Sequence, residues 1–317
     1  MRAHAADPEV PDHGLRPRHP GTSPWTAAVA MAALVLGACG DKSDATAPTQ
    51  VEAPPPATWL AKPRALAREL DATTVDGKDL WTTFLSKRNA NGEVDQVSLV
   101  LRVLDAQGAT LEATLARGAA LAAPTMAAFG DGVCVVWEDE SSGAACLMGC
   151  LVAIDPATGQ IAPSTAVVVS DEQTPRLPEL APLPNGGVAL AWQALVGTNY
   201  ELFLSQLASP GEVAAPWSVP RRLTNNEADD WCPSLAASGP AAAPKLHLAF
   251  DRFTPGGPHG FDVVHMEIDL LAGAGPGLET LVATGPNFQG YPSIAANPEA
   301  ENEVWIAYEE APQFGEY

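Results

Sequence analysis

Short apolar segments recur along most of the chain at a nearly constant interval. In each segment apolar residues alternate with other residues, and the segment closes on an aromatic. The closing aromatics are Phe84, Trp137, Trp192, Phe250 and Tyr308, in steps of 53, 55, 58 and 58 residues. Because period-two alternation is typical of a β-strand, we predict a strand at each position, with Trp137 and Trp192 buried in the core.

A second marker has nearly the same spacing. It reads Pro, any residue, an aliphatic residue and Ala, and it begins at Pro124, Pro178, Pro233 and Pro292, in steps of 54, 55 and 59 residues. Two markers that stay in phase predict a repeat architecture, in which each copy is one small structural unit.

Each repeat divides into four short strands. The proline marker is the first strand, the segment with the closing aromatic is the second, and a polar, glycine-containing turn follows. The predicted third strands are residues 97–104, 147–154, 200–207 and 261–268, and the predicted fourth strands are residues 111–115, 165–169, 221–223 and 279–282. In second strands such as residues 133–137 both alternating sets are apolar, so both faces must be covered.

These features predict an all-β fold, a β-propeller of four-stranded antiparallel blades. Residues 58–317 contain four full blades and a partial fifth, which has only its first two strands before the sequence stops. We therefore expect an incomplete chain from a propeller of about six to eight blades. Residues 58–70 offer at most one strand to pair with residues 304–308. Sandwich domains would need roughly 100 residues per unit, and the period excludes them.

Several segments resemble TolB-type and sialidase-like propellers. The TolB-type order of a Leu-Thr, an Asp, a Pro-Ser, an Ala-Phe with a nearby Arg and an aromatic-acidic strand is matched at Leu223-Thr224, Asp229, Pro233-Ser234, Ala249-Phe250, Arg252 and Phe261-Asp262. The resemblance spans residues 63–317 and implies the propeller fold. The Ser-Pro-Asp-Gly turn of the TolB type is missing. The Asp box and the N-terminal Arg-Ile-Pro of sialidases are missing as well, so the resemblance implies no sialidase activity.

The N-terminal part has the features of an export signal. An apolar run ends in Leu36-Gly37-Ala38-Cys39, which resembles the bacterial lipobox, in which the Cys is lipidated and becomes the first mature residue. The run is too short to span a membrane but has the length of a signal-peptide core. We predict a signal peptide with lipobox over residues 1–39, lipidation at Cys39, and a disordered tether over residues 40–57. An ordinary secretory signal is the alternative.

Acidic residues outnumber basic ones. With 17 Lys+Arg against 38 Asp+Glu, the formal net charge is -21, so the summed field repels nucleic acids and anionic lipid surfaces. The predicted partners are an envelope protein or a glycan, and the membrane is reached only through the lipid anchor. No phosphate-loop or dinucleotide motif occurs in the sequence, and no cofactor is expected.

Polar residues gather just beyond the closing aromatics, and a propeller places these positions on one rim with the connections into the next blade. The candidate ligand-binding residues are Glu138, Asp139, Asp229, Asp230, Trp231, Asp251, Arg252, Glu309 and Glu310. Such an acidic rim could bind a cation, a basic peptide or a sugar. The alternative is that these residues are solvated hairpin tips whose charge protects strand edges.

Four cysteines remain after the lipobox, an even number that favours disulfides in an exported protein. Cys146 and Cys150 share one strand, about 13 Å apart if extended, which is too far to bridge. The predicted disulfide is Cys134 with Cys150, and a four-cysteine metal site is the alternative. His247 and His265 face each other across a hairpin, where packing and hydrogen bonding are favoured over a metal ion. No metal site is predicted.

The sequence thus predicts an exported, lipid-anchored β-propeller of the bacterial cell envelope, periplasmic or surface-exposed, that acts as a binding or scaffolding module without catalytic residues. The alternative is a propeller glycoside hydrolase that uses rim carboxylates such as Glu138 with Glu309. Two carboxylates about 5 to 10 Å apart in a concave pocket favour the hydrolase, and carboxylates spread around the rim favour the binding module.

Overall fold

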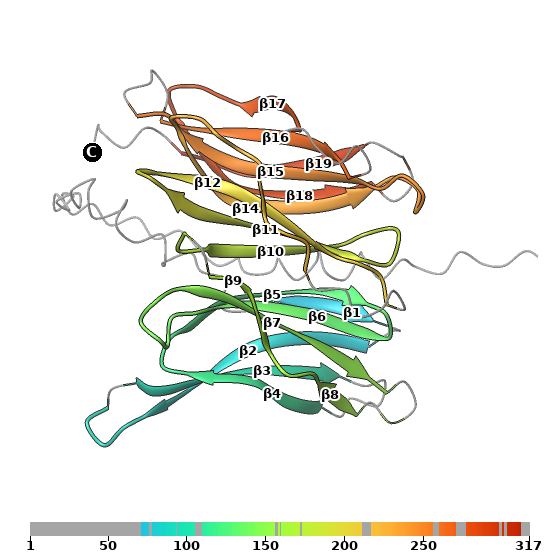
Figure 1. The fold of residues 1–317 in the computed structure, drawn as a ribbon. Coiled ribbons are helices and arrows are strands. Elements are labelled where there is room, and N and C mark those ends of the chain that lie inside the picture. Colours follow the sequence, from blue (N-terminus) through green and yellow to red (C-terminus); the bar gives the residue numbers. More distant parts are fainter. Residues whose placement is uncertain are drawn as a thin grey trace, which may run out of the picture. The chain divides into compact units, whose positions relative to one another are not determined.

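The computed structural model describes residues 71–311, apart from gaps at 76–77, 93, 105–109, 156–157, 159, 172, 211–216, 256–259, 271–276, 298–299 and 301–302. Regular structure in this part of the chain is β-strand throughout (Figure 1). Among the described residues no helix is long and apolar enough to cross a membrane. The predicted signal peptide, the tether and residues 58–70 lie outside the described residues.

The strands form successive antiparallel sheets in which neighbours along the chain are hydrogen-bonded neighbours. Blade 1 comprises β1 (Ala72–Val75), β2 (Lys78–Arg88), β3 (Val94–Leu104) and β4 (Thr110–Gly118). Blade 2 comprises β5 (Leu121–Phe129), β6 (Gly132–Asp139), β7 (Cys146–Ile154), β8 (Ile161–Pro163) and β9 (Val167–Ser170). Blade 3 comprises β10 (Arg176–Pro182), β11 (Val188–Val196), β12 (Asn199–Leu207) and β13 (Arg221–Arg222). Blade 4 comprises β14 (Asp229–Ser238), β15 (Lys245–Phe253), β16 (Phe261–Asp269) and β17 (Leu278–Ala283). The fifth unit comprises β18 (Phe288–Ala296) and β19 (Val304–Ala311).

This is a β-propeller with four full blades and a two-stranded fifth unit, which confirms the predicted fold class. The predicted strands agree with the observed ones to within a few residues at their ends. Two strands were not predicted. β1 carries no proline marker, and β8 is a second short segment that pairs with β7 ahead of β9.

Consecutive sheets pack face to face, and the apolar residues of their second and third strands fill the layers between them. One cluster joins blades 1 and 2, a second joins blades 2 and 3, a third joins blades 3 and 4, and a smaller one joins blade 4 to the fifth unit. Trp137 and Trp192 are each 1% exposed, so their predicted burial is confirmed. Both sets of alternating residues are buried because each central sheet has a sheet on either side.

The predicted equivalence of Phe84 with the other closing aromatics is wrong by one residue. Trp137 packs toward the preceding blade, whereas Phe84 lies on the face of blade 1 that packs against the following one. The pairing of β1 with β2 gives the reason. The Thr82 N–H donates to the Asp71 carbonyl at 2.9 Å, and Asp71 occupies the place that Thr125 has in blade 2, opposite Val136. Thr83, rather than Phe84, is therefore the counterpart of Trp137.

The predicted disulfide between Cys134 and Cys150 is not formed, because both side chains are thiols. Cys134 lies opposite Leu151, and Cys150 lies opposite Val135. The two thiols therefore point to opposite faces of the sheet, Cys134 toward blade 3 and Cys150 toward blade 1. This one-residue difference in register separates them.

His247 and His265 form the packed pair that was predicted. His247 Nδ1 lies 3.3 Å from His265 Nε2, and His247 Nε2 lies 2.8 Å from the Ser238 hydroxyl. Burial lowers the pKa of both imidazoles, which favours their neutral forms. Within the described ranges no group of three or more His, Cys, Asp or Glu side chains is arranged to hold a metal ion.

Candidate functional site

Each of the four proline markers sits in a β-bulge of a first strand. Register with the second strand shifts across Ala122/Thr125, Arg176/Glu179, Trp231/Ser234 and Gly290/Ser293. The residue before each proline has a positive φ: 44° at Ala123, 48° at Leu177, 50° at Cys232 and 53° at Tyr291. Proline has no N–H to give to a ladder, so a sheet accommodates it at a bulge. The repeated proline thus turns the backbone at one height in four successive first strands.

The bulges are tied to the preceding blade by side-chain acceptors. The residue after the closing aromatic accepts the N–H of the positive-φ residue of the next blade. These bonds are Leu177 N–H to Glu138 at 2.7 Å, Cys232 N–H to Gln193 at 2.9 Å and Tyr291 N–H to Asp251 at 2.9 Å. Because buried N–H groups need a partner, these residues hold neighbouring blades in register.

A second hydrogen bond follows three residues later on the same strands. The residue after the proline accepts an N–H from the first strand of the next blade: Leu180 N–H donates to the Thr125 hydroxyl at 3.1 Å, and Ile294 N–H donates to the Ser234 hydroxyl at 3.3 Å. In blade 1 Asp71 does the same for the Met126 N–H at 2.7 Å. Between blades 2 and 3, and between blade 4 and the fifth unit, the next first strand is thus held by two bonds, one from the second strand and one from the first strand of the preceding blade.

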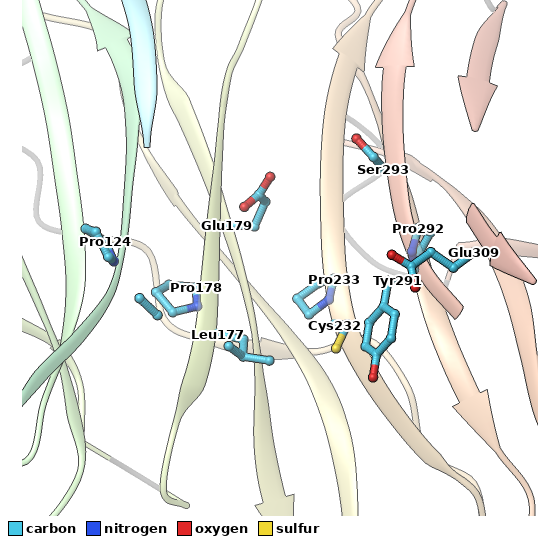
Figure 2. A pocket seen from close by; sticks show the side chains of 11 residues that line it. Pro124, Leu177, Pro178, Glu179, Cys232, Pro233, Tyr291, Pro292, Ser293 and Glu309 are labelled. Atoms are coloured by element: carbon cyan, nitrogen blue, oxygen red, sulfur yellow. The ribbon is translucent and has the colours of Figure 1, made fainter. Parts of the chain in front are cut away.

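A cavity of about 230 Å³ opens where the four bulges meet. Figure 2 shows Pro124, Pro178, Pro233 and Pro292 in a row on successive strands. The other lining residues are Ala123, Leu177, Glu179, Cys232, Tyr291, Ser293 and Glu309. Glu179 and Glu309 contribute carboxylates, and Tyr291 and Ser293 contribute hydroxyls, to a wall that is otherwise mostly apolar. We call this cavity the axial pocket.

The carboxyl group of Asp251 lies behind the wall between blade 4 and the fifth unit. Asp251 is 1% exposed, and this burial raises its pKa to about 8 although bonds from the Tyr291 N–H and the Cys232 thiol oppose the shift. Burial also raises the pKa of Tyr291 to about 12, and the negative charge of Glu309 adds to both shifts. This side of the axial pocket therefore carries a carboxyl group that holds a proton near neutral pH and a phenol that stays neutral.

Several of the predicted rim residues take part in contacts that hold the propeller together. Glu138 is buried, accepts from Leu177, and is ion-paired with Arg176 at 3.3 Å. Asp230 is fully buried and ion-paired with Arg252 at 2.7 Å. These carboxylates have structural contacts that occupy their oxygens.

The remaining rim residues have local partners as well. Asp139, Asp229 and Glu310 accept hydrogen bonds from Ser141, Tyr200 and Asn287 respectively. Trp231 packs among Tyr200, Phe253 and Phe261. Only Glu309 of the nine candidates lines the axial pocket, with Asp251 behind it. A ligand-binding role for the others stays a prediction.

The pocket residues Glu179, Cys232, Tyr291 and Ser293 were not among the candidates. They belong to the proline marker itself or directly precede its proline, and the marker was interpreted only as a strand. A signal was present, since a repeated proline within a strand marks either a sheet edge or a bulge, and a bulge redirects the side chains beside it. The turn between the second and third strands of a blade was predicted to lie on the same rim as the connection into the next blade. In blade 3 this is correct, because the Asn199 amide at the turn donates to the Asn226 carbonyl in the connection to β14 at 2.9 Å.

No family model matches the sequence, and no curated protein matches it. Similar solved structures include an endo-arabinase from Bacteroides thetaiotaomicron VPI-5482, with 10% identity and a TM-score of 0.48 over 79% of this chain and 95% of that one. They also include a Cellvibrio cellulosa α-L-arabinanase complexed with arabinohexaose, with 11% identity and a TM-score of 0.40 over 78% of this chain and 87% of that one. A puromycin hydrolase matches with 17% identity and a TM-score of 0.40 over 68% of this chain and 29% of that one. At these values the likeness concerns the arrangement of strands.

Proposed function

We propose that the axial pocket binds a carbohydrate. The observation that carries the proposal is the convergence of four proline bulges on a cavity whose polar groups are the carboxylates of Glu179 and Glu309 and the hydroxyls of Tyr291 and Ser293. Carboxylates and hydroxyls accept hydrogen bonds from sugar hydroxyls. The proline rings and the Tyr291 ring offer apolar surface to the C–H face of a sugar.

The negative charge of the chain and the small volume of the cavity limit the class of carbohydrate that the pocket can bind. A formal net charge of -21 and two carboxylates in the wall disfavour an anionic ligand. The cavity of about 230 Å³ is smaller than the roughly 300–1,000 Å³ of pockets that enclose drug-sized ligands. A neutral sugar ring at the end of a chain, or an exposed ring within one, fits both limits.

Hydrolysis of the bound glycan is the second candidate function. The observation in its favour is that two carboxylates, Glu179 and Glu309, line one cavity, since glycoside hydrolases use a pair of Asp or Glu residues, one as the acid and one as the base or nucleophile. The pair suggested by the sequence, Glu138 with Glu309, does not fit, because Glu138 is occupied between blades 2 and 3.

Calorimetric titration with neutral oligosaccharides, arabinohexaose among them, tests the binding proposal. We expect Glu179→Gln to weaken binding about ten-fold or more, because a hydrogen bond to a charged group contributes about 1.5–3 kcal/mol. Glu310→Gln is the matched control. Glu310 neighbours Glu309, binds Asn287 and lies outside the pocket, so its variant should bind as the wild type does. Equal binding by Glu179→Gln and the wild type would refute the site.

A reducing-sugar assay on a panel of neutral polysaccharides that includes arabinan separates binding from hydrolysis. If the pocket is catalytic, Glu179→Gln and Glu309→Gln each remove turnover while Glu310→Gln keeps it. Binding without turnover by the wild type assigns the pocket to a glycan-binding module.

We also propose that the propeller is exported and lipid-anchored. Support comes from the sequence alone, namely an apolar run that ends in Leu36-Gly37-Ala38-Cys39 and a proline-rich segment between that Cys and the repeats. A lipid on Cys39 would attach the protein to a membrane without a spanning helix.

A further inference from the structure

Half-buried aromatic side chains form a continuous row along the rim of the propeller where its second strands end. Each ring contacts the next, and the ring centroids of the contacting pairs lie 5.0–6.4 Å apart. The members of the row are Tyr200, Trp231, Phe253, Phe261, Phe288 and Tyr291. We call this row the aromatic strip.

The strip follows one rim because its members occupy the same end of antiparallel strands. Phe253 is the last residue of β15 and lies opposite Phe261, the first residue of β16. Phe288 is the first residue of β18, and Tyr200 is the second residue of β12. Trp231 lies at the bulge of β14, and its ring contacts both Tyr200 of blade 3 and the two phenylalanines of blade 4.

The strip differs from the aromatic core of the propeller in its exposure. The core residues Trp137, Trp192 and Phe250 are each at most 1% exposed. Every member of the strip, by contrast, keeps part of its surface accessible. A contiguous accessible apolar surface at a rim is typical of a ligand-binding groove or an interaction site.

The blade architecture does not require an aromatic residue at the centre of the strip. Trp231 precedes the proline of its marker by two residues, where the other repeats have Ala122, Arg176 and Gly290. These repeats form the same bulge with a small or a charged residue at this position. The indole at Trp231 is therefore a feature of this part of the rim rather than of the repeat.

The strip is continuous with the axial pocket. Tyr291, at one end of the strip, lines the pocket, and so does Cys232, which directly follows Trp231. Figure 2 shows the Cys232 and Tyr291 side chains beside each other in the pocket wall. From this wall the strip crosses blade 4 in the order of its strands, from β14 to β15 and β16. A ligand chain that leaves the pocket along blade 4 would meet these rings.

We propose that the axial pocket and the aromatic strip together bind one neutral polysaccharide chain, and this proposal rests on the proposed binding of a sugar in the pocket. The pocket of about 230 Å³ holds one sugar ring, and the aromatic strip stacks against the C–H faces of the units that follow. The Asp229 carboxylate, which accepts the Tyr200 N–H at 2.7 Å, adds a hydrogen-bond acceptor beside the rings. The net charge of -21 disfavours an anionic polysaccharide.

The dependence of affinity on the length of the ligand tests the proposal. The probes are neutral oligosaccharides of two and of six sugar units from arabinan, xylan and cellulose, titrated calorimetrically into the full chain. Within a series that binds, we expect the six-unit ligand to bind about ten-fold more tightly than the two-unit ligand, because further units stack on further rings.

Variants of the strip separate it from the pocket. Tyr200→Leu and Phe253→Leu remove a flat ring and keep an apolar side chain. The double variant should weaken binding of the six-unit ligand about ten-fold and leave binding of the two-unit ligand unchanged. Phe203→Leu is the matched control, because this half-buried ring stacks on Trp192 outside the strip. Thermal denaturation of all variants measures any loss of stability.

The outcomes distinguish a failure of the strip from a failure of the pocket. If the double variant binds the six-unit ligand as the wild type does, the strip is refuted, even where Glu179→Gln weakens both ligands and so supports the pocket. If the double variant weakens binding but Glu179→Gln does not, the pocket is refuted, and with it the single site. A wild type that binds none of the probes would refute both.

Discussion

At the scale of single residues, the side chains at the position after the closing aromatic share one property, which is that they accept a hydrogen bond. Glu138, Gln193 and Asp251 differ in length and charge, yet each takes one backbone N–H of the next blade. An acceptor is required there and a charge is not. Glu138 is charge-paired with Arg176, whereas burial raises the pKa of Asp251 to about 8. The raised value makes Asp251 a source of pH dependence.

We expect Asp251→Asn to remove part of the pH dependence of stability. Between the ordinary pKa near 3.8 and the folded value of about 8, the folded state keeps a proton that the unfolded state has lost. The free energy of unfolding of the wild type therefore falls as pH rises through this window. Asn still accepts from the Tyr291 N–H, so the variant should gain about 1 kcal/mol or more over the wild type between pH 5 and pH 8.

Urea denaturation at both pH values measures this difference. The exposed Asp131, changed to Asn, is the control and should follow the wild type. An Asp251→Asn variant whose stability falls with pH as steeply as that of the wild type would show that Asp251 is not the group responsible.

At the scale of strands, the proline bulge is the element that builds the axial pocket. It places a residue with positive φ before each proline, and that conformation costs an L-residue roughly 1–2 kcal/mol. The cost is offset by the inter-blade bond that the N–H of the same residue makes in blades 3, 4 and 5.

A pair of alanines in β5 tests the backbone of the bulge. Ala123 has φ 44° and is 4% exposed, and Ala127 is 2% exposed in the regular part of the same strand. Ala123→Gly should be neutral or stabilise the fold by up to about 1 kcal/mol, because Gly adopts positive φ without strain. Ala127→Gly should cost about 0.5–1 kcal/mol. Thermal denaturation compares the two, and an equal loss in both variants would contradict the strained conformation at Ala123.

At the scale of the whole molecule, the predicted signal peptide with lipobox, residues 1–39, predicts where the propeller is located in the cell. We expect metabolic labelling with a clickable fatty acid to mark the wild type and to fail for Cys39→Ser, since the thiol is the acceptor of the lipid. Cys134→Ser is the matched control, because Cys134 lies buried in blade 2 and should not change labelling. Equal labelling of Cys39→Ser, or release of the wild type as a soluble protein, would refute the anchor.

The number and order of the blades were predictable from the sequence. Alternation, proline and closing aromatic are local features, and each of them repeats with the unit that carries it. A strand with apolar residues on both faces has to be covered on both, so the burial of Trp137 and Trp192 followed as well. The proline within the first strands of blades 2 to 4 and of the fifth unit was also a signal for the bulge that forms the wall of the axial pocket, because a proline within a strand marks either a sheet edge or a bulge.

Which residues line the site, and which face of the sheet each side chain takes, was decided by the tertiary structure. Cys134 and Cys150 are separated, and Phe84 faces blade 2, because a shift of one residue in pairing exchanges the two faces of a strand. The sequence around these residues does not encode that shift. Glu138 and Glu309 occupy equivalent positions, yet Glu138 is covered by blade 3 and Glu309 lines the pocket. Whether a carboxylate connects two blades or is available to a ligand depends on which strand lies opposite it, and that is settled only when the blades pack.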